Sequence, residues 1–239
     1  MTIATFPPDM PGAIVFPAHV TNAYDPLAHG SPNRPRAFIL HTPEEPADTY
    51  PSTPHWFAQF HPQQAGSTHY FVAYTGRTYQ CVPERWGAIA NGLDGKPRPS
   101  WALPATSLNW QTLSVEIEGY AATIGQTLKV GSVQWTALIK LIRERCGAHG
   151  IPLDREHIMG HYQLSTNRSD PGATFPWAAL MHELQGDEPM TAQEKAEFEA
   201  MKKEIADLKG YAWTGAVRDN GQDKILWDHA VRLNELEKK

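Results

Sequence analysis

Alternating hydrophobic and polar positions predict a set of short strands in the first half of the chain. We expect strands at residues 36–42, 69–73, 77–82 and 113–118. The second and third flank the turn Tyr74-Thr75-Gly76 and predict a hairpin. In the first strand, alternation places Ala37, Ile39 and His41 on one face. His41 therefore stands at the end of a strand, where the backbone holds a side chain rigidly.

A helical repeat follows Ser132, which is a suitable N-cap, and stops at Gly150-Ile151-Pro152. Its apolar positions recur at three- and four-residue intervals, namely Trp135, Leu138, Ile139, Ile142 and Cys146. Thr53-Pro54 opens a predicted short helix at 55–60, and Pro176 opens another at 177–184. These elements make one domain over residues 1–185.

Two segments outside the regular pattern define the domain organisation. Residues 1–35 are rich in Pro, His and Asn and predict an irregular arm laid over the domain. After a linker at 186–189 the composition changes to Ala, Glu and Lys, which predicts a helical C-terminal tail over 186–239. The apolar stripes of this tail are too narrow for isolated helices. We therefore expect the tail to self-associate or to dock onto a partner.

Composition narrows the function classes. Of the 239 residues, 41% are hydrophobic and 20% are charged, which is compatible with a packed core. The net charge of -5 argues against binding nucleic acid or an anionic membrane by bulk electrostatics. No apolar stretch reaches the length of a membrane span, and the first 18 residues, with prolines at 7, 8 and 11, do not resemble a signal peptide. We expect a soluble product made in the cytoplasm, with no membrane insertion.

Two cysteines, Cys81 and Cys146, are present and have no CxxC spacing, which excludes a cysteine-rich zinc knuckle. Isolated cysteines in a chain of this length are more often buried thiols than a disulfide. We expect buried reduced thiols and leave the disulfide open as an alternative.

The candidate chemistry centres on residues 160–172, which contain His161 and Asp170 and end in a Pro-Gly turn. A folded loop can direct both side chains to one point, and His41 is the best candidate for a third ligand. Two His and one Asp on Zn²⁺, with the fourth position left to water, is a catalytic zinc arrangement. His157 is the rival ligand because it lies four residues before His161, but Gly160 interrupts any helix between them. The remaining histidines are interpreted as surface or core residues.

Glu116 and Glu118 share one face of the predicted strand at 113–118, between apolar positions. A solvated strand face explains them without function, and a turn before Pro171-Gly172 likewise explains Asp170. A general base beside a metal-bound water gives Glu116 a chemical reason to be there. Both interpretations remain open from the residues alone.

Five segments in this order resemble the zinc-dependent N-acetylmuramoyl-L-alanine amidases of the type 2 family, whose fold is shared by peptidoglycan recognition proteins and phage endolysins. The resemblance covers roughly residues 14–185. The matching segments are Phe38-Ile39-Leu40-His41-Thr42, Ser67 to Val72 with Gly76 and Tyr79-Gln80, Val115-Glu116-Ile117-Glu118-Gly119, Gly160-His161, and Asp170-Pro171-Gly172 followed by Phe175. Each segment is weak alone, and the five together are specific.

The resemblance implies an α/β domain in which helices flank a central mixed sheet and zinc lies in a groove. His41, His161 and Asp170 resemble the zinc ligands, and Glu116 resembles the acidic residue that activates the zinc-bound water. Arg168 occupies the position where the family often has Lys or Thr, thought to stabilise the oxyanion. The guanidinium keeps the charge but differs from an ammonium in shape.

The chain departs from the family pattern near the expected substrate groove. Thr68 replaces a frequent tyrosine, and the Ala-Trp-His-Ala-Gly-like segment becomes Ala88-Ile89-Ala90-Asn91-Gly92, without its histidine. We expect Asn91 and His69 to contact substrate instead.

The implied function is hydrolysis of the amide bond between N-acetylmuramic acid and L-alanine in peptidoglycan. The appended tail and the lack of a signal peptide favour a phage or prophage endolysin that reaches the cell wall after holin-type release. A cytoplasmic wall-recycling amidase and a non-catalytic peptidoglycan recognition module are the alternatives. A recognition module keeps the groove but does no chemistry. In any of these functions the tail at 186–239 is expected to be an oligomerisation or wall-targeting element.

Overall fold

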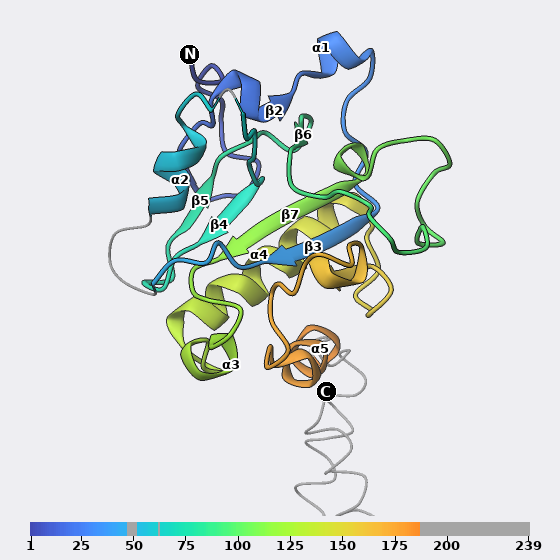
Figure 1. The fold of residues 1–239 in the computed structure, drawn as a ribbon. Coiled ribbons are helices and arrows are strands. Elements are labelled where there is room, and N and C mark those ends of the chain that lie inside the picture. The colour runs from blue at the N-terminus through green and yellow to red at the C-terminus, as the bar shows by residue number, and fades with distance from the viewer. Residues whose placement is uncertain (47–51, 62, 187–239) are drawn as a thin grey trace, which may run out of the picture. The chain divides into compact units, whose positions relative to one another are not determined.

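The computed structural model describes residues 1–46, 52–61 and 63–186 (Figure 1). The chain divides into two units, Met1–Met181 and His182–Lys239. The predicted helical tail, and its expected self-association, fall on residues outside the described range. Among the described residues, no helix is long and apolar enough to cross a membrane.

A mixed six-stranded sheet forms the centre of the domain, as the family resemblance implied. Its strand order is β1-β5-β4-β7-β3-β8, and every neighbouring pair is parallel except the β4–β5 hairpin. The strands are β1 (Ile14–Val15), β3 (Ala37–His41), β4 (Tyr70–Val72), β5 (Thr78–Gln80), β7 (Thr112–Ile117) and β8 (Ile158–Gly160). A separate antiparallel pair joins β2 (Ala23–Tyr24) to β6 (Gly87–Ala88).

The longest helix among the described residues, α4 (Val133–His149), packs against one face of the sheet and runs behind β7 and β3 in Figure 1. The sequence predicted both of its ends. The Ser132 hydroxyl accepts the backbone N–H of Trp135, and Gly150 ends the helix in the left-handed conformation. The other helices are α1 (Pro26–His29), α2 (Ser52–Phe57), α3 (Ile124–Thr127), α5 (Trp177–Gln185) and the 3-10 turns η1 (Val20–Asn22), η2 (Leu108–Trp110) and η3 (His161–Gln163).

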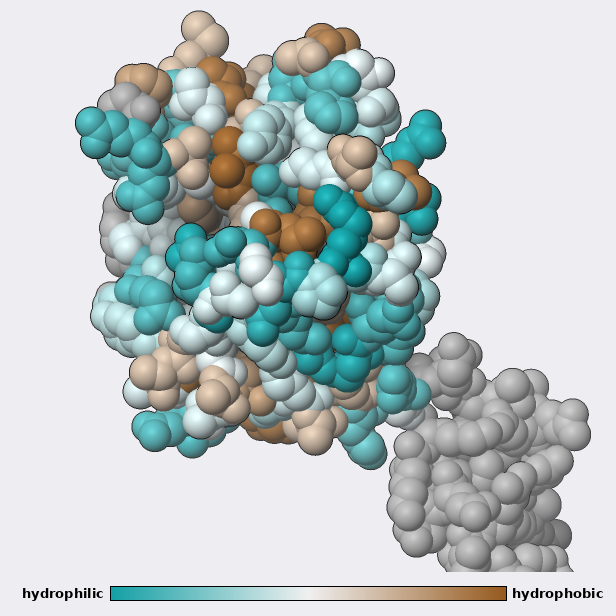
Figure 2. Space-filling model, turned by 45° about the vertical axis from the view of Figure 1, so that its right-hand side comes forward, coloured by the Kyte–Doolittle hydropathy of each residue, from teal (hydrophilic) through white to brown (hydrophobic). Residues whose placement is uncertain are grey.

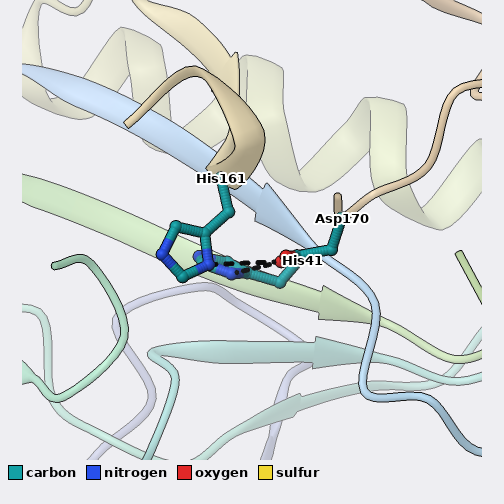
Figure 3. Close-up of side chains that lie close together, drawn as sticks. All are labelled: His41, His161 and Asp170. Atoms are coloured by element: carbon teal, nitrogen blue, oxygen red, sulfur yellow. Dashed lines mark hydrogen bonds and ion pairs between the residues drawn. The ribbon is translucent and has the colours of Figure 1, made fainter. Parts of the chain in front are cut away.

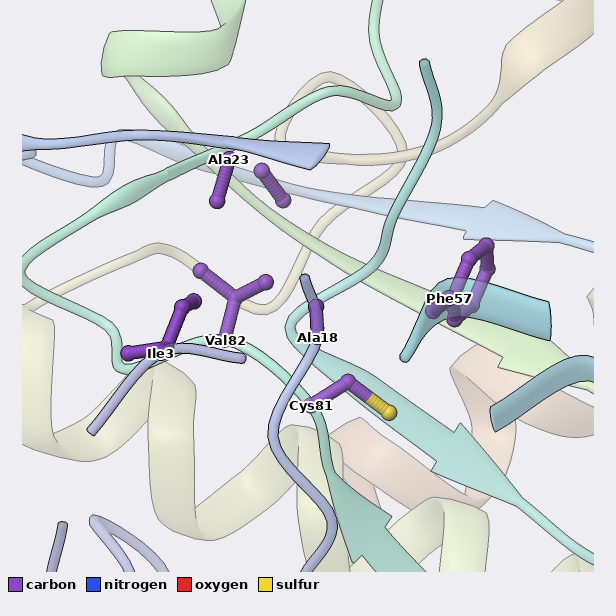
Figure 4. Packing of buried hydrophobic residues seen from close by; sticks show 7 residues of the cluster. Ile3, Ala18, Ala23, Phe57, Cys81 and Val82 are labelled. Carbon is purple, nitrogen blue, oxygen red and sulfur yellow. The ribbon is translucent and has the colours of Figure 1, made fainter. Parts of the chain in front are cut away.

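The N-terminal arm is more regular than predicted. Its β1 strand adds to the sheet edge by pairing with β5, and Ile3 and Ala18 pack into a buried cluster with Cys81 and Val82 (Figure 4). Cys81 and Cys146 are buried free thiols, as expected for two isolated cysteines in a chain of this length, and burial raises the pKa of Cys146 to about 12.

A buried ion pair fastens α4 to the segment after β5. The Arg145 guanidinium donates to both carboxylate oxygens of Glu84 at 2.7 and 2.8 Å, and His149 and the Tyr70 hydroxyl also contact this carboxylate. Burial alone would raise the pKa of Glu84, but the hydrogen bonds from His149 and Arg145 outweigh it and lower the pKa to about 2.

The interior of β3 explains why its last residue is rigid. Ala37, Phe38, Ile39 and Leu40 are fully buried. Ala37 and Ile39 pack in one cluster with Met159, which agrees with the predicted strand face. On the surface drawn in Figure 2, hydrophobic residues form separate patches between hydrophilic ones.

Candidate metal centre

Two histidines meet at the carboxyl edge of the sheet. His41 is the last residue of β3, and His161 directly follows β8, its parallel neighbour. Because the carboxyl ends of parallel strands lie at the same edge, residues 120 positions apart are brought together. The two imidazole rings are 4.6 Å apart between centroids, at 68° to each other.

Asp170 reaches the same point from the loop after η3. The Tyr162 backbone N–H donates to the Asp170 carbonyl at 3.1 Å and fixes the loop to η3. Two close contacts near His161 and Asp170 require glycine, one at Gly160 and one at Gly172. A Cβ on Gly160 would lie 2.7 Å from Cδ of Pro171, and Gly172 has φ of 111° with the Ala121 carbonyl oxygen 2.0 Å from where a Cβ would be. These glycines hold the carboxylate beside the histidines.

The three side chains present their donor atoms to one point (Figure 3). Asp170 Oδ2 lies 2.9 Å from His41 Nδ1 and 3.3 Å from His161 Nδ1, and all three ligand atoms are within 4.8 Å of one another. Two imidazole nitrogens and one carboxylate oxygen form a donor set suited to zinc, and three protein ligands leave a position for water or substrate. The residues present therefore fit the expected ion.

Electrostatics at this cluster also fit a cation site. Burial would raise the pKa of Asp170, but its contacts with His161 and His41 lower it strongly, so the carboxylate is ionised. Burial is the main cause that lowers the pKa of His161, which keeps its imidazole neutral and able to bind a metal. For His41, burial lowers the pKa, but the contact with Asp170 outweighs it and the net shift is upward.

A cavity of about 820 Å³ opens over this cluster and is lined by all three residues together with Glu116 and Arg168. Glu116 pairs in register with His41 across β7 and β3. Its Oε2 is buried and has no hydrogen-bond partner among the described residues. Burial, reinforced by the negative charges of Asp170 and Glu45, raises the pKa of Glu116 to about 7. A carboxyl group with this pKa is poised to exchange a proton near neutral pH.

Arg168 lies on the exposed rim of the same cavity, two residues before Asp170. The rival ligand His157 lies elsewhere. Its Nδ1 contacts Asp154 at 2.8 Å, and it lines a different cavity with Trp101 and His149. The structure thus brings His41, His161 and Asp170 together and leaves His157 out.

The two positions expected to contact substrate are buried instead. His69 is fully buried, its Nδ1 lies 3.1 Å from the Ser114 hydroxyl, and burial lowers its pKa to about 4. Asn91 is 2% exposed and lies 2.8 Å from His41 Nε2. Neither lines the cavity, so direct contact with substrate is not the role that these positions support. Their side chains make buried contacts instead, His69 with Ser114 and Asn91 with His41 and Thr112.

Two residues near the cluster, Thr112 and Glu45, were not predicted from the sequence. The Thr112 hydroxyl contacts Asn91 behind the cluster, 21 residues away in the chain. Glu45 lines the cavity, and its Oε1 is buried without a hydrogen-bond partner among the described residues. A Thr at a strand start and a Glu in a Pro-rich loop are common, so only the tertiary structure distinguishes them.

A buried carboxylate beside a nitrogen, nitrogen and oxygen donor set is the arrangement of a metal-dependent hydrolase. The family model described as N-acetylmuramoyl-L-alanine amidase matches residues 31–173, which is more than half of the chain. The chain belongs to this amidase family. A comparison with curated protein sequences found no match.

Two solved structures have a similar fold. A selenomethionine derivative of AmpD matches with a TM-score of 0.55 and 18% identity, covering 73% of this chain and 96% of that chain. A mutant endolysin from Bacillus subtilis matches with a TM-score of 0.51 and 16% identity, covering 73% and 99%. At these identities the similarity shows the fold alone.

Proposed function

We propose that this amidase is zinc-dependent and that His41, His161 and Asp170 hold the ion. The observation that carries the proposal is the convergence of two Nδ1 atoms and one carboxylate oxygen in a cavity that also contains a buried, unpartnered Glu116 oxygen. When bound, zinc supplies Lewis acidity for the scissile carbonyl and acidifies water. The bond cleaved is the amide between the lactyl group of N-acetylmuramic acid and L-alanine.

Glu116 is the proposed general base and acid. Its raised pKa, about 7, lets the carboxylate take a proton from the attacking water and return it to the departing α-amine of L-alanine. Its strand position fixes the carboxyl group beside His41 and therefore beside the reacting carbonyl.

Arg168 is proposed to stabilise the negative charge that develops on the carbonyl oxygen. It lies at the cavity rim and carries a permanent positive charge and several N–H donors. Because the side chain is exposed, it can adjust to the substrate without breaking a buried contact.

We further propose that the substrate is the polymeric cell wall, as expected for an endolysin-like enzyme. The cavity lining includes the exposed residues Gln64 and Ala65 and the exposed residues 167–169. Such a cavity admits a stem peptide while the glycan strand stays outside. Faster release of peptides from intact sacculi than from soluble muropeptides is the expected result, and the reverse preference would favour a recycling role.

The test of the amidase proposal separates catalysis from binding. Wild-type protein and Glu116→Gln are incubated with purified peptidoglycan, and newly released amino groups are labelled and identified. We expect new L-alanine amino termini with the wild type and almost none with the variant, while both sediment with the peptidoglycan. Sedimentation of wild-type protein without any new amino terminus would instead identify a recognition module.

A further inference from the structure

Asn91 connects His41 to the backbone of η2 through a chain of buried hydrogen bonds. Asn91 Oδ1 lies 2.8 Å from His41 Nε2, and Asn91 Nδ2 lies 2.7 Å from the Thr112 hydroxyl oxygen. The Thr112 hydroxyl lies 2.8 Å from the Leu108 carbonyl oxygen. Asn91 is 2% exposed and Thr112 is fully buried, so water does not replace these contacts.

The donors and acceptors in this series of hydrogen bonds are set by the Leu108 carbonyl at its end. A carbonyl oxygen only accepts, so the Thr112 hydroxyl donates to Leu108 and its oxygen is left to accept from Asn91 Nδ2. The amide oxygen of Asn91 then faces the ring of His41. An amide oxygen also only accepts, so His41 Nε2 must carry a hydrogen.

The backbone of Asn91 is fixed as firmly as its side chain. The Asn109 side-chain oxygen accepts the N–H of Asn91 at 2.7 Å and that of Ala90 at 3.2 Å. The Ser107 hydroxyl in turn accepts the N–H of Asn109 at 3.3 Å. Hydrogen bonds thus hold both the backbone and the side chain of Asn91, as an orienting residue requires.

We propose that Asn91 is a positioning residue that places the hydrogen of His41 on Nε2 and leaves Nδ1 to bind the metal ion. This inference rests on the proposed metal site. Nδ1 is the atom that faces Asp170 Oδ2, so the hydrogen bond from Nε2 aims the free electron pair at the ligand cluster. Reversing the amide would require hydrogen on Nδ1 and would block this atom. Hydrogen bonds of this kind typically change metal affinity by about 10–100-fold.

Three variants test the assignment, each checked for folding by circular dichroism. Asn91→Leu removes the acceptor at similar volume, Asn91→Asp keeps an acceptor, and Thr112→Val removes the far hydroxyl. Zinc affinity is measured by competition with a fluorescent chelator. We expect Asn91→Leu to bind zinc about 10–100-fold more weakly, Asn91→Asp to stay near the wild type, and Thr112→Val to fall between them.

Nitrogen–proton NMR of the imidazole groups gives a second readout that needs no activity. In wild-type protein we expect the Nε2 hydrogen of His41 to be protected from exchange with water both with and without zinc. With zinc, Nδ1 holds the metal. Without zinc, Nδ1 carries a hydrogen as well. Protection should disappear in Asn91→Leu. Unchanged protection and zinc affinity in that variant, or a hydrogen on Nδ1 in the zinc-loaded protein, would overturn the inference. A wild-type protein that binds no zinc would refute the proposed function, and the metal-free spectrum would still decide the role of Asn91.

Discussion

His41 and Glu116 are register partners on the parallel strands β3 and β7, so their side chains project from the same face of the sheet at neighbouring positions. One is a proposed metal ligand and the other is the proposed base. Both belong to regular strands rather than to loops, and both line the cavity. The sheet therefore fixes the proposed ligand His41 and the proposed base Glu116 relative to each other without any loop movement.

Glu116→Gln should remove activity and stabilise the metal-free protein. Loss of a general base typically costs about 10²–10⁴-fold in turnover. The pKa of Glu116 is raised from 4.5 to about 7, so its ionisation destabilises the fold increasingly as pH rises from 4.5 to about 7. Above that range the neutral Gln should increase the free energy of unfolding by about 3 kcal/mol at most.

Urea unfolding of the metal-free protein measures this effect at pH values below and above the range. At the lower pH both side chains are neutral, so we expect the same free energy of unfolding for the wild type and Glu116→Gln. Glu118→Gln is the control, because Glu118 follows β7 but does not line the cavity. It should keep turnover. A destabilised Glu116→Gln protein at neutral pH would contradict the assigned pKa.

Alanine at a zinc ligand should abolish stoichiometric zinc binding, whereas alanine at the rival histidine should not. His161→Ala and Asp170→Ala each remove a donor atom from the cluster, and His157→Ala removes a ring that contacts Asp154 instead. Native mass spectrometry counts the bound ions. At a zinc concentration 100-fold above the dissociation constant, binding should stabilise the wild type by about 2.7 kcal/mol. Zinc loss in His157→Ala alone would refute the ligand set.

Arg168→Ala should lower turnover while leaving zinc affinity unchanged. Removing one donor that stabilises an oxyanion typically costs about 10²–10³-fold, and the exposed position of Arg168 predicts the lower end. Arg168→Lys keeps the charge and should recover part of the loss. Arg98→Ala, an exposed arginine outside the cavity lining, is the matched control. Equal turnover in all three variants would remove Arg168 from the mechanism.

Acid should weaken the fold through Glu84. Its pKa is lowered from 4.5 to about 2, so the stability it contributes is complete above pH 4.5 and is lost as pH falls toward 2. The loss attributable to this carboxyl group is about 3 kcal/mol. Urea unfolding across this range measures it. Lys140→Ala, which breaks the exposed pair with Glu144, should change stability by less than about 0.5 kcal/mol and keep the same pH slope.

The sequence predicted the elements that carry strong local patterns. The alternation at 36–42 placed His41 correctly at the end of β3, and the capping residues Ser132 and Gly150 bounded α4. It did not predict β8 (Ile158–Gly160) or β1 (Ile14–Val15), because strands this short are defined by pairing with β3 and β5 rather than by their own residues.

Some residues of the candidate site could likewise be predicted from the sequence, and others could not. His41, His161 and Asp170 could be proposed from motifs, and the structure brings their donor atoms together. Asn91 and His69 were placed in the groove because they lie in segments that resemble it. The sequence could not show that both side chains are buried, because their burial depends on contacts with the distant residues Ser114 and His41.

Zinc-dependent amidase activity can be measured by mass spectrometry of peptidoglycan fragments after incubation with the protein alone, with a zinc chelator, and after back-titration with Zn²⁺. We expect free stem peptides that begin with L-alanine, their loss on chelation, and their return when zinc is restored. Undiminished release of these peptides from a protein shown to be free of metal would contradict zinc dependence. No release at all from the zinc-loaded protein would contradict the amidase mechanism itself.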